Sequence, residues 1–234
     1  MANTSALTIA TNIFTAPGEA FAAIKERPSP WLPLLLVLLG YCAVTYFYMS
    51  AVDFPWLMDR QLQQADMTDE QRAQTVDAIT RVPATAVTAF SVAGTCIAMV
   101  IAFAITALYY TIVSSVTKNG VKFNQWFGLV WWCALPTVLG LLATLVNVLT
   151  GDMRFVVQEA INPLSFGNLL GIDATNASTL ERVLLSRDPT ALWAMVLGIL
   201  GYQVLSQKSI VHSAIVVLAP AAVIVLVSVL ASFF

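Results

Sequence analysis

The sequence predicts an all-α protein, a polytopic membrane helical bundle of five transmembrane helices. Hydrophobic residues make up 59% of the 234 residues and charged residues only 10%, whereas a soluble domain carries about 25% charge. The apolar residues are concentrated in five blocks with almost no charge inside them, which is typical of membrane spans. A backbone in hydrocarbon must satisfy its own polar groups, so each block is expected to be a helix within one membrane domain, residues 1–234.

The chain begins with a predicted interfacial segment, residues 1–30. Within it, residues 15–27 have apolar positions on one face and basic residues at the end, as in a helix lying on a membrane surface. Thr15 is expected to cap this helix, and Pro17 suits its first turn.

The spans follow the interfacial segment at intervals along the chain. We expect them at about 31–51, 84–116, 125–150, 190–205 and 210–233. The second is too long for a hydrocarbon core of about 30 Å, so it is expected to tilt, bend or protrude. It carries small residues at four-residue spacing, Gly94, Ala98 and Ala102, which allow another helix to approach closely.

A polar, acidic segment, residues 53–81, separates the first two spans. Thr68 and Gln71 form a capping-box pattern that predicts the start of a helix. We interpret the segment as a helical hairpin outside the bilayer, which is either a solvated loop or a site for a partner.

The third span is interrupted by Pro136, which removes one backbone donor and is expected to bend the helix. Trp131 and Trp132 lie a little over one turn earlier. Two interpretations remain open, a kinked helix that packs against its neighbours and a hinge that lines a cavity or groove.

After the third span, residues 160–172 are uncharged but too short to cross a membrane. They contain Asn162 and Pro163, and they form either a re-entrant or interfacial segment or an ordinary amphipathic loop. Asp188 is a candidate N-cap for the fourth span. Gly201 offers that span a close-packing face against the fifth.

The basic residues predict the orientation. With a cytoplasmic N-terminus, the short inner segments hold Lys25, Arg27, Lys118, Lys122 and Lys208, whereas the arginines of the longer outer segments are more dilute. Because basic residues concentrate on the cytoplasmic side, we expect the N-terminus inside and the C-terminus outside.

The sequence contains no pattern of residues that predicts an enzyme or a cofactor. His212 is the only histidine and lies near a predicted interface, where packing or snorkelling explains it better than catalysis. No His/Cys spacing suggests a metal site, and no basic cluster suggests nucleic acid. Cys42, Cys96 and Cys133 fall in three different spans and are interpreted as small apolar core residues.

Polar residues inside the predicted spans are few. No charged residue is expected deep in any span, which counts against an ion-coupled carrier. Asn147, Gln203 and Thr106 are the polar intramembrane candidates, and interhelical hydrogen bonding is the default role for each.

The chain resembles bacterial members of the Yip1 domain family in three stretches, residues 13–37, 122–140 and 161–218. They match an entry helix with a proline break, an aromatic-containing turn followed by proline, and a late loop with Asn-Pro before a Trp-bearing span. The resemblance covers nearly the whole chain and implies a five-span protein of the bacterial inner membrane. Eukaryotic members usually have Gly-Tyr where Val130-Trp131-Trp132 stands here, and they bind prenylated small GTPases. We do not transfer that role, because a fold does not imply a function.

Two hypotheses therefore remain. The first is a non-enzymatic organiser or scaffold that binds membrane lipids, another membrane protein or a second copy of itself. The second is a small channel or carrier for a neutral or lipid-like solute, whose path lies between the bent third span and the Asn162-Pro163 segment. An intramembrane enzyme is a distant third, because no nucleophile and base can be assembled on facing helices.

Overall fold

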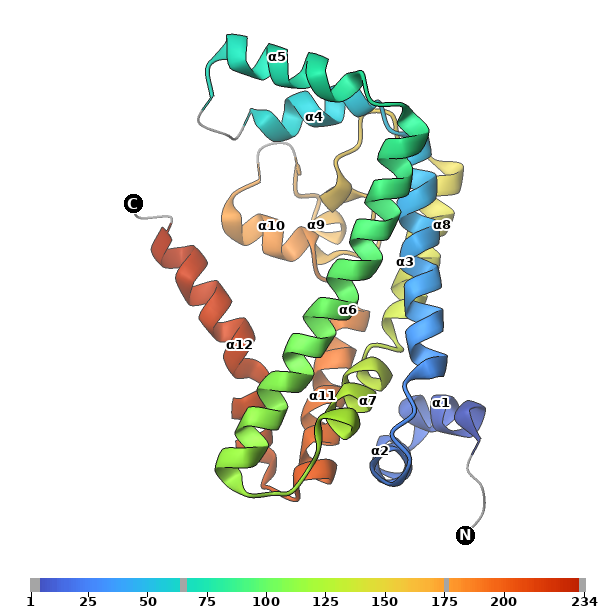
Figure 1. Cartoon of the computed structure of the whole chain (residues 1–234), viewed down its shortest axis with the longest axis vertical. Coiled ribbons are helices and arrows are strands. Elements are labelled where there is room, and N and C mark those ends of the chain that lie inside the picture. The colour runs from blue at the N-terminus through green and yellow to red at the C-terminus, as the bar shows by residue number, and fades with distance from the viewer. Residues whose placement is uncertain (1–4, 64–66, 175–176, 232–234) are drawn as a thin grey trace.

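The computed structural model describes residues 5–63, 67–174 and 177–231, which form an elongated bundle of helices (Figure 1). No strand occurs in this part of the chain. In chain order the elements are α1 (Ala6–Thr15), α2 (Pro17–Glu26), α3 (Trp31–Ala51), α4 (Phe54–Leu62), α5 (Asp69–Thr80), α6 (Ala84–Thr117), α7 (Phe123–Cys133), α8 (Thr137–Thr150), the 3-10 turn η1 (Gln158–Ala160), α9 (Phe166–Leu169), α10 (Thr179–Leu185), α11 (Pro189–Ser206) and α12 (Ile210–Ala231).

Three helices, α3, α6 and α11, are long and apolar enough to cross a membrane. The pair α7 and α8 makes a fourth span if the two helices, which are bent by 45° relative to each other, are counted as one. The described apolar part of α12, Ile210–Val223, is shorter. The all-α membrane fold is thus confirmed with three to four candidate spans, and the fifth span stays a prediction.

The bend in the third predicted span has a local cause at Pro136. Proline has no N–H to donate to the Trp132 carbonyl, one helical turn earlier. That carbonyl instead accepts a hydrogen bond of 3.2 Å from the Leu135 N–H, and the Thr137 hydroxyl donates to the Ala134 carbonyl at 2.7 Å. The backbone therefore tightens into a turn here, and α7 and α8 leave it in different directions.

Two N-terminal helices, α1 and α2, lie across one end of the bundle (Figure 1). Phe21 and Ile24 of α2 are fully buried, and α2 packs against α7 and α11. The expectation that Thr15 caps α2 is wrong, because α1 extends through it and its hydroxyl bonds to the Thr11 carbonyl. Ala16 precedes α2 and makes no side-chain cap. Contact of these helices with a membrane surface stays a prediction.

The hairpin of α4 and α5 lies at the opposite end of the bundle (Figure 1). The predicted capping box is confirmed, because the Thr68 hydroxyl accepts from the Gln71 N–H at 3.2 Å and the Gln71 side chain accepts from the Thr68 N–H at 3.0 Å. Its exposure outside the bilayer stays a prediction.

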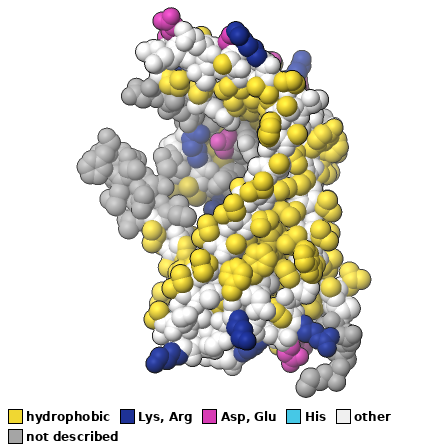
Figure 2. Space-filling view, viewed as in Figure 1, with side chains coloured by type: hydrophobic (Ala, Val, Ile, Leu, Met, Phe, Trp, Pro, Cys, Tyr) yellow, Lys and Arg dark blue, Asp and Glu magenta, His cyan; other side chains and the backbone are white. Residues whose placement is uncertain are grey.

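The turns between α6 and α7 and between α11 and α12 lie at the same end as α1 and α2 (Figure 1). Lys118 and Gln207 take the left-handed conformation there, with φ of 52° and 57°, and so end α6 and α11 sharply. Several lysine and arginine side chains lie at this end, and others lie at the opposite end (Figure 2). Those in the elements and turns at this end are Lys25, Arg27, Lys118, Lys122 and Lys208.

Candidate functional site

The aromatic candidates of the bent span are enclosed by the bundle. Trp131 is fully buried, and its ring lies 4.5 Å from that of Phe103 on α6. Trp132 is 1% exposed and donates its indole N–H to the Ser29 carbonyl at 2.9 Å. Pro136 is buried beside them. These contacts support the interpretation of α7 and α8 as a kinked packing element rather than a mobile hinge.

The loop between α8 and α11 folds back along the bundle. The Tyr48 hydroxyl of α3 donates to the Val156 carbonyl at 2.9 Å. Further along the loop, the Asn147 side chain of α8 donates to the Ile161 carbonyl at 2.8 Å. Asn147 therefore satisfies a loop carbonyl rather than bonding another span, and the loop is fastened to two helices in succession.

Asn162 and Asp188 form the centre of a polar cluster at the start of α11. The Asn162 side chain donates to Asp188 Oδ2 at 2.7 Å. The other oxygen, Oδ1, accepts from the Thr190 hydroxyl at 2.6 Å and from the Ala191 N–H at 2.9 Å. Asn168 donates to the Asn162 carbonyl at 2.7 Å, and Pro163 follows beside it, half-buried. Asp188 is only 8% exposed.

This cluster lies level with the middle of α3. A Cβ at Gly140 would be 2.7 Å from Asp188 Oδ2, and a Cβ at Gly40 would be 2.9 Å from the Leu141 side chain. Gly40 is the tenth of the 21 residues of α3, so the cluster lies roughly 15 Å from the hairpin end of that helix at 1.5 Å per residue. Asp188 caps α11 from outside the helix, and the candidate spans themselves contain no charged residue. The re-entrant and the ordinary-loop interpretations of residues 160–172 both stay predictions.

The sequence pattern identified Asp188 as a cap but not its partner. Asn162 and Asp188 are 26 residues apart, and no local spacing rule connects them. A carboxylate that caps a helix and also accepts an amide hydrogen bond fastens the loop to α11. Three donors of the chain already occupy the two carboxylate oxygens, which favours a structural anchor over a substrate site.

The start of the loop, near the hairpin, is different in character. Asp152 and Arg154 form an exposed ion pair of 2.7 Å. The hydrogen bonds from Arg154 lower the pKa of Asp152 to about 2. The loop thus runs from a charged, exposed beginning to the buried cluster at Asp188.

The small residues of α6 face outward. Gly94, Ala98 and Ala102 are exposed, and a Cβ added at Gly94 would meet no atom within 4 Å. Large apolar side chains flank them on the same helix, among them Ile97 and Ile101 at 60% and 52% exposure. Figure 2 shows hydrophobic side chains along the surface of the long helices of the bundle.

Gly201 has the opposite surroundings. It is buried where α11 meets α2 and α7, and a Cβ there would overlap the Leu129 side chain and lie 3.1 Å from the Phe21 ring. Gly201 is therefore an internal packing position, against α2 and α7 rather than against the fifth predicted span, which sets it apart from Gly94. Gln203 is half-buried on the same helix, and its carbonyl accepts from the Gln207 N–H at 2.9 Å.

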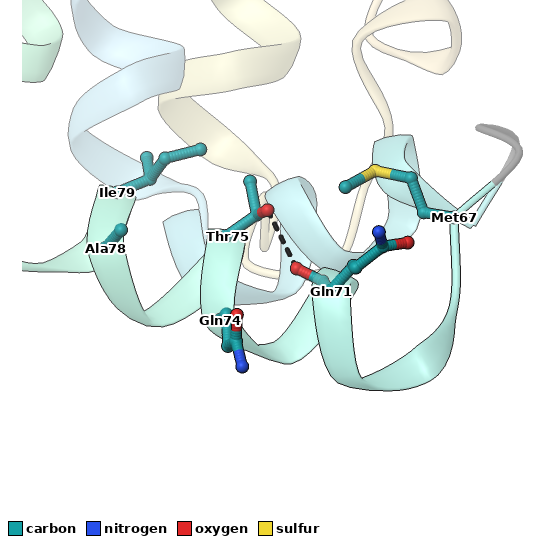
Figure 3. A pocket seen from close by; sticks show the side chains of 6 residues that line it. All are labelled: Met67, Gln71, Gln74, Thr75, Ala78 and Ile79. Atoms are coloured by element: carbon teal, nitrogen blue, oxygen red, sulfur yellow. Dashed lines mark hydrogen bonds between the residues drawn. The ribbon is translucent and has the colours of Figure 1, made fainter.

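A shallow depression of about 470 Å³ lies on α5 (Figure 3). Its lining residues are Met67, Gln71, Gln74, Thr75, Ala78 and Ile79. The Thr75 hydroxyl donates to the Gln71 carbonyl at 2.8 Å, so it serves the helix itself (Figure 3). The depression is open and is lined by α5 and by Met67, two residues before it, and it gives no reason to assign a ligand.

Among the described residues, no three His, Cys, Asp or Glu side chains lie close enough to hold a metal ion. His212 lies near the aromatic residues of α11, with its ring 6.2 Å from that of Tyr202. This arrangement supports the packing role expected for it.

Comparison with known proteins gives one family and one relative. The family model described as Yip1 domain matches residues 11–232. A Bacillus subtilis (strain 168) protein, described as membrane protein YknW, is 27% identical over 190 residues, which cover 81% of this chain and 74% of the relative. No solved structure matches the chain.

Proposed function

Because the chain belongs to the Yip1 domain family of membrane proteins, we propose that it is a non-enzymatic organiser that binds a partner membrane protein along the outward face of α6. The partner is a second copy or a different membrane protein, and membrane lipids cover the rest of the apolar surface. The main support for this proposal is the stripe of small residues Gly94, Ala98 and Ala102. At Gly94, an added Cβ would meet no other atom of the chain within 4 Å.

A partner helix packs better than lipid chains on this stripe of small residues. Glycine inside a helix is less favourable than alanine by about 1 kcal/mol, and flexible lipid chains gain nothing from its small size. A neighbouring helix does gain, because two backbones can approach closely and increase their van der Waals contact. The flanking ridge of Ile97 and Ile101 provides side chains that can pack beside such a helix.

We place the protein in the bacterial cytoplasmic (inner) membrane, with its N-terminus in the cytoplasm and its C-terminus outside. The relative in Bacillus subtilis is a membrane protein. All four lysines and Arg27 lie in the short segments at the end that carries α1 and α2, which supports a cytoplasmic location for that end.

The test is native mass spectrometry of the protein released from nanodiscs that contain its own membrane lipids. We expect a defined oligomer or a co-purifying membrane protein. Gly94→Leu should abolish the complex, because the larger side chain holds the helices apart, while the variant remains folded since Cβ at this position meets open space. Gly18 of α2, another exposed glycine at which an added Cβ would meet no atom within 4 Å, provides the matched control Gly18→Leu, which should retain it.

The alternative is a small channel or carrier for a neutral or lipid-like solute. The buried polar cluster at Asp188 and Asn162 is the observation that favours it. The same mass spectra distinguish the two functions: a monomer that retains one stoichiometric lipid or small molecule would contradict the organiser and identify the solute for a flux assay.

A further inference from the structure

Two cysteines from different spans meet inside the bundle. Cys42 of α3 and Cys96 of α6 are 54 residues apart, and their Sγ atoms lie 2.7 Å from each other. Both side chains are half-buried. The helices that carry them pack side by side (Figure 1), so the contact joins two of the three longest apolar helices.

A hydrogen bond between thiols does not explain so close an approach. The S–H group is a weak donor and sulfur is a weak acceptor, so the contact gains little energy while the two thiols remain separate. A disulfide joins its sulfur atoms at about 2.0 Å, and only a small movement of two side chains separates this pair from it. The side chains are already directed toward each other from facing helices.

We propose that Cys42 and Cys96 are a redox pair that closes a disulfide between α3 and α6, with a membrane-dissolved quinone as the oxidant. Each thiol loses its hydrogen and one S–S bond forms. The two electrons and two protons reduce the quinone to its quinol. Reduction by a dithiol reverses the reaction.

The position of the pair determines the class of oxidant. Cys42 is the twelfth of the 21 residues of α3, so it lies near the middle of that span and far from either aqueous phase. Water-soluble oxidants are excluded from hydrocarbon, whereas quinones dissolve in it. Because the thiols are half-buried rather than enclosed, a lipid-soluble oxidant can reach them from the side of the bundle.

The bond would connect the two helices on either side of the α4–α5 hairpin. The chain between Cys42 and Cys96 contains the outer part of α3, the hairpin and the start of α6. A cross-link here closes that stretch into a loop and restricts the unfolded chain. Cys133, buried on α7, is an internal reference that should stay a thiol.

The full chain in nanodiscs is incubated with decylubiquinone, whose fully substituted ring has no position for thiol addition. It is then denatured, alkylated with iodoacetamide and weighed intact. We expect one alkyl group, on Cys133, and a protein lighter by two hydrogens; after reduction we expect three alkyl groups. Peptide mapping should join Cys42 to Cys96, and the oxidised protein should melt about 5 °C or more above the reduced protein.

Single substitutions provide the controls. Cys133→Ala should still form the cross-link, whereas Cys42→Ala and Cys96→Ala should each leave two alkylated thiols. Three alkyl groups on the quinone-treated wild type, or a disulfide that includes Cys133, would overturn the proposal. The measurement on the wild type requires no variant to fold.

Discussion

At the scale of single residues, the Asp188 carboxylate makes hydrogen bonds to two different elements. Its Oδ1 caps α11 through Ala191 and Thr190, and its Oδ2 holds Asn162 of the folded-back loop. A buried carboxylate is tolerated because three donors replace the water that it has lost. The bond between Asn162 and Asp188 therefore fastens the loop to α11, in addition to its attachments to α3 and α8.

We expect Asp188→Ala to reduce the free energy of unfolding by about 2 kcal/mol, because the cap is lost and the Asn162 amide is left without its acceptor. Asp188→Asn retains one oxygen for Ala191 and should cost less. Reversible unfolding in detergent, followed by circular dichroism, measures the difference.

Asp53 provides the matched control for this prediction. It caps the more exposed helix α4 through the Trp56 N–H at 3.0 Å, so Asp53→Ala should lose only a cap, about 1 kcal/mol. Equal losses at Asp53 and Asp188 would mean that the Asn162 bond contributes nothing.

At this scale, sequence patterns correctly predicted hydrogen bonds between residues that are close together in the chain. The box of Thr68 and Gln71 and the cap at Asp188 are both confirmed. Thr15 was the exception, since an N-cap pattern does not reveal a helix that arrives from the other side. The Asn162–Asp188 and Cys42–Cys96 pairs depend on how helices pack, which spacing within one element cannot reveal.

At the scale of elements, the two glycine positions have opposite roles. Gly201 allows α11 to touch α2 and α7, while Gly94 opens a face of α6 to its surroundings. Sequence spacing treats the two alike, because small residues at helical intervals show that a face is smooth but not whether a helix of the same chain already covers it.

We expect Gly201→Ala to lower the free energy of unfolding of the isolated protein by about 1–3 kcal/mol, since the added methyl overlaps Leu129. Gly94→Ala should leave it unchanged or raise it slightly, because alanine favours the helix. Thermal unfolding of both variants in the same detergent tests the contrast. A neutral Gly201→Ala would show that Leu129 can move away at no cost.

The break at Pro136 was predictable from chemistry alone, because proline removes a donor wherever a helix contains it. Its surroundings were not. The buried Trp131 and Trp132 rings and the Ser29 carbonyl that accepts from Trp132 come from packing between α7 and distant segments, so the choice between a rigid kink and a hinge required the fold.

At the scale of the whole molecule, the lysines follow the topology. All four lysines lie at the end opposite the α4–α5 hairpin, whereas arginines occur at both ends. The helical class and several spans followed from composition, since long uncharged blocks leave few alternatives. The count was less certain, because the described apolar part of α12 is shorter than the other spans.

We expect a cysteine introduced at Gln74 of α5, in a protein lacking its native cysteines, to react with a membrane-impermeant maleimide added to intact bacteria. A cysteine at Asn119, in the α6–α7 turn, should react only after the membrane is opened. The reverse pattern would place the N-terminus outside and contradict the proposed orientation.

The length of α3 determines how close the hairpin lies to the membrane. Its 21 residues span about 31 Å, close to the hydrocarbon core of about 30 Å, and α4 begins at Phe54, directly after α3 ends at Ala51. When α3 crosses the core, the α4–α5 hairpin therefore rests near the lipid headgroups, and the extra length of α6, with its 34 residues, is taken up by tilt or extends past the core at the basic end. An antibody fragment that recognises the hairpin would bind beside the lipid surface and offers a way to hold this small protein for imaging while its apolar faces stay in the bilayer.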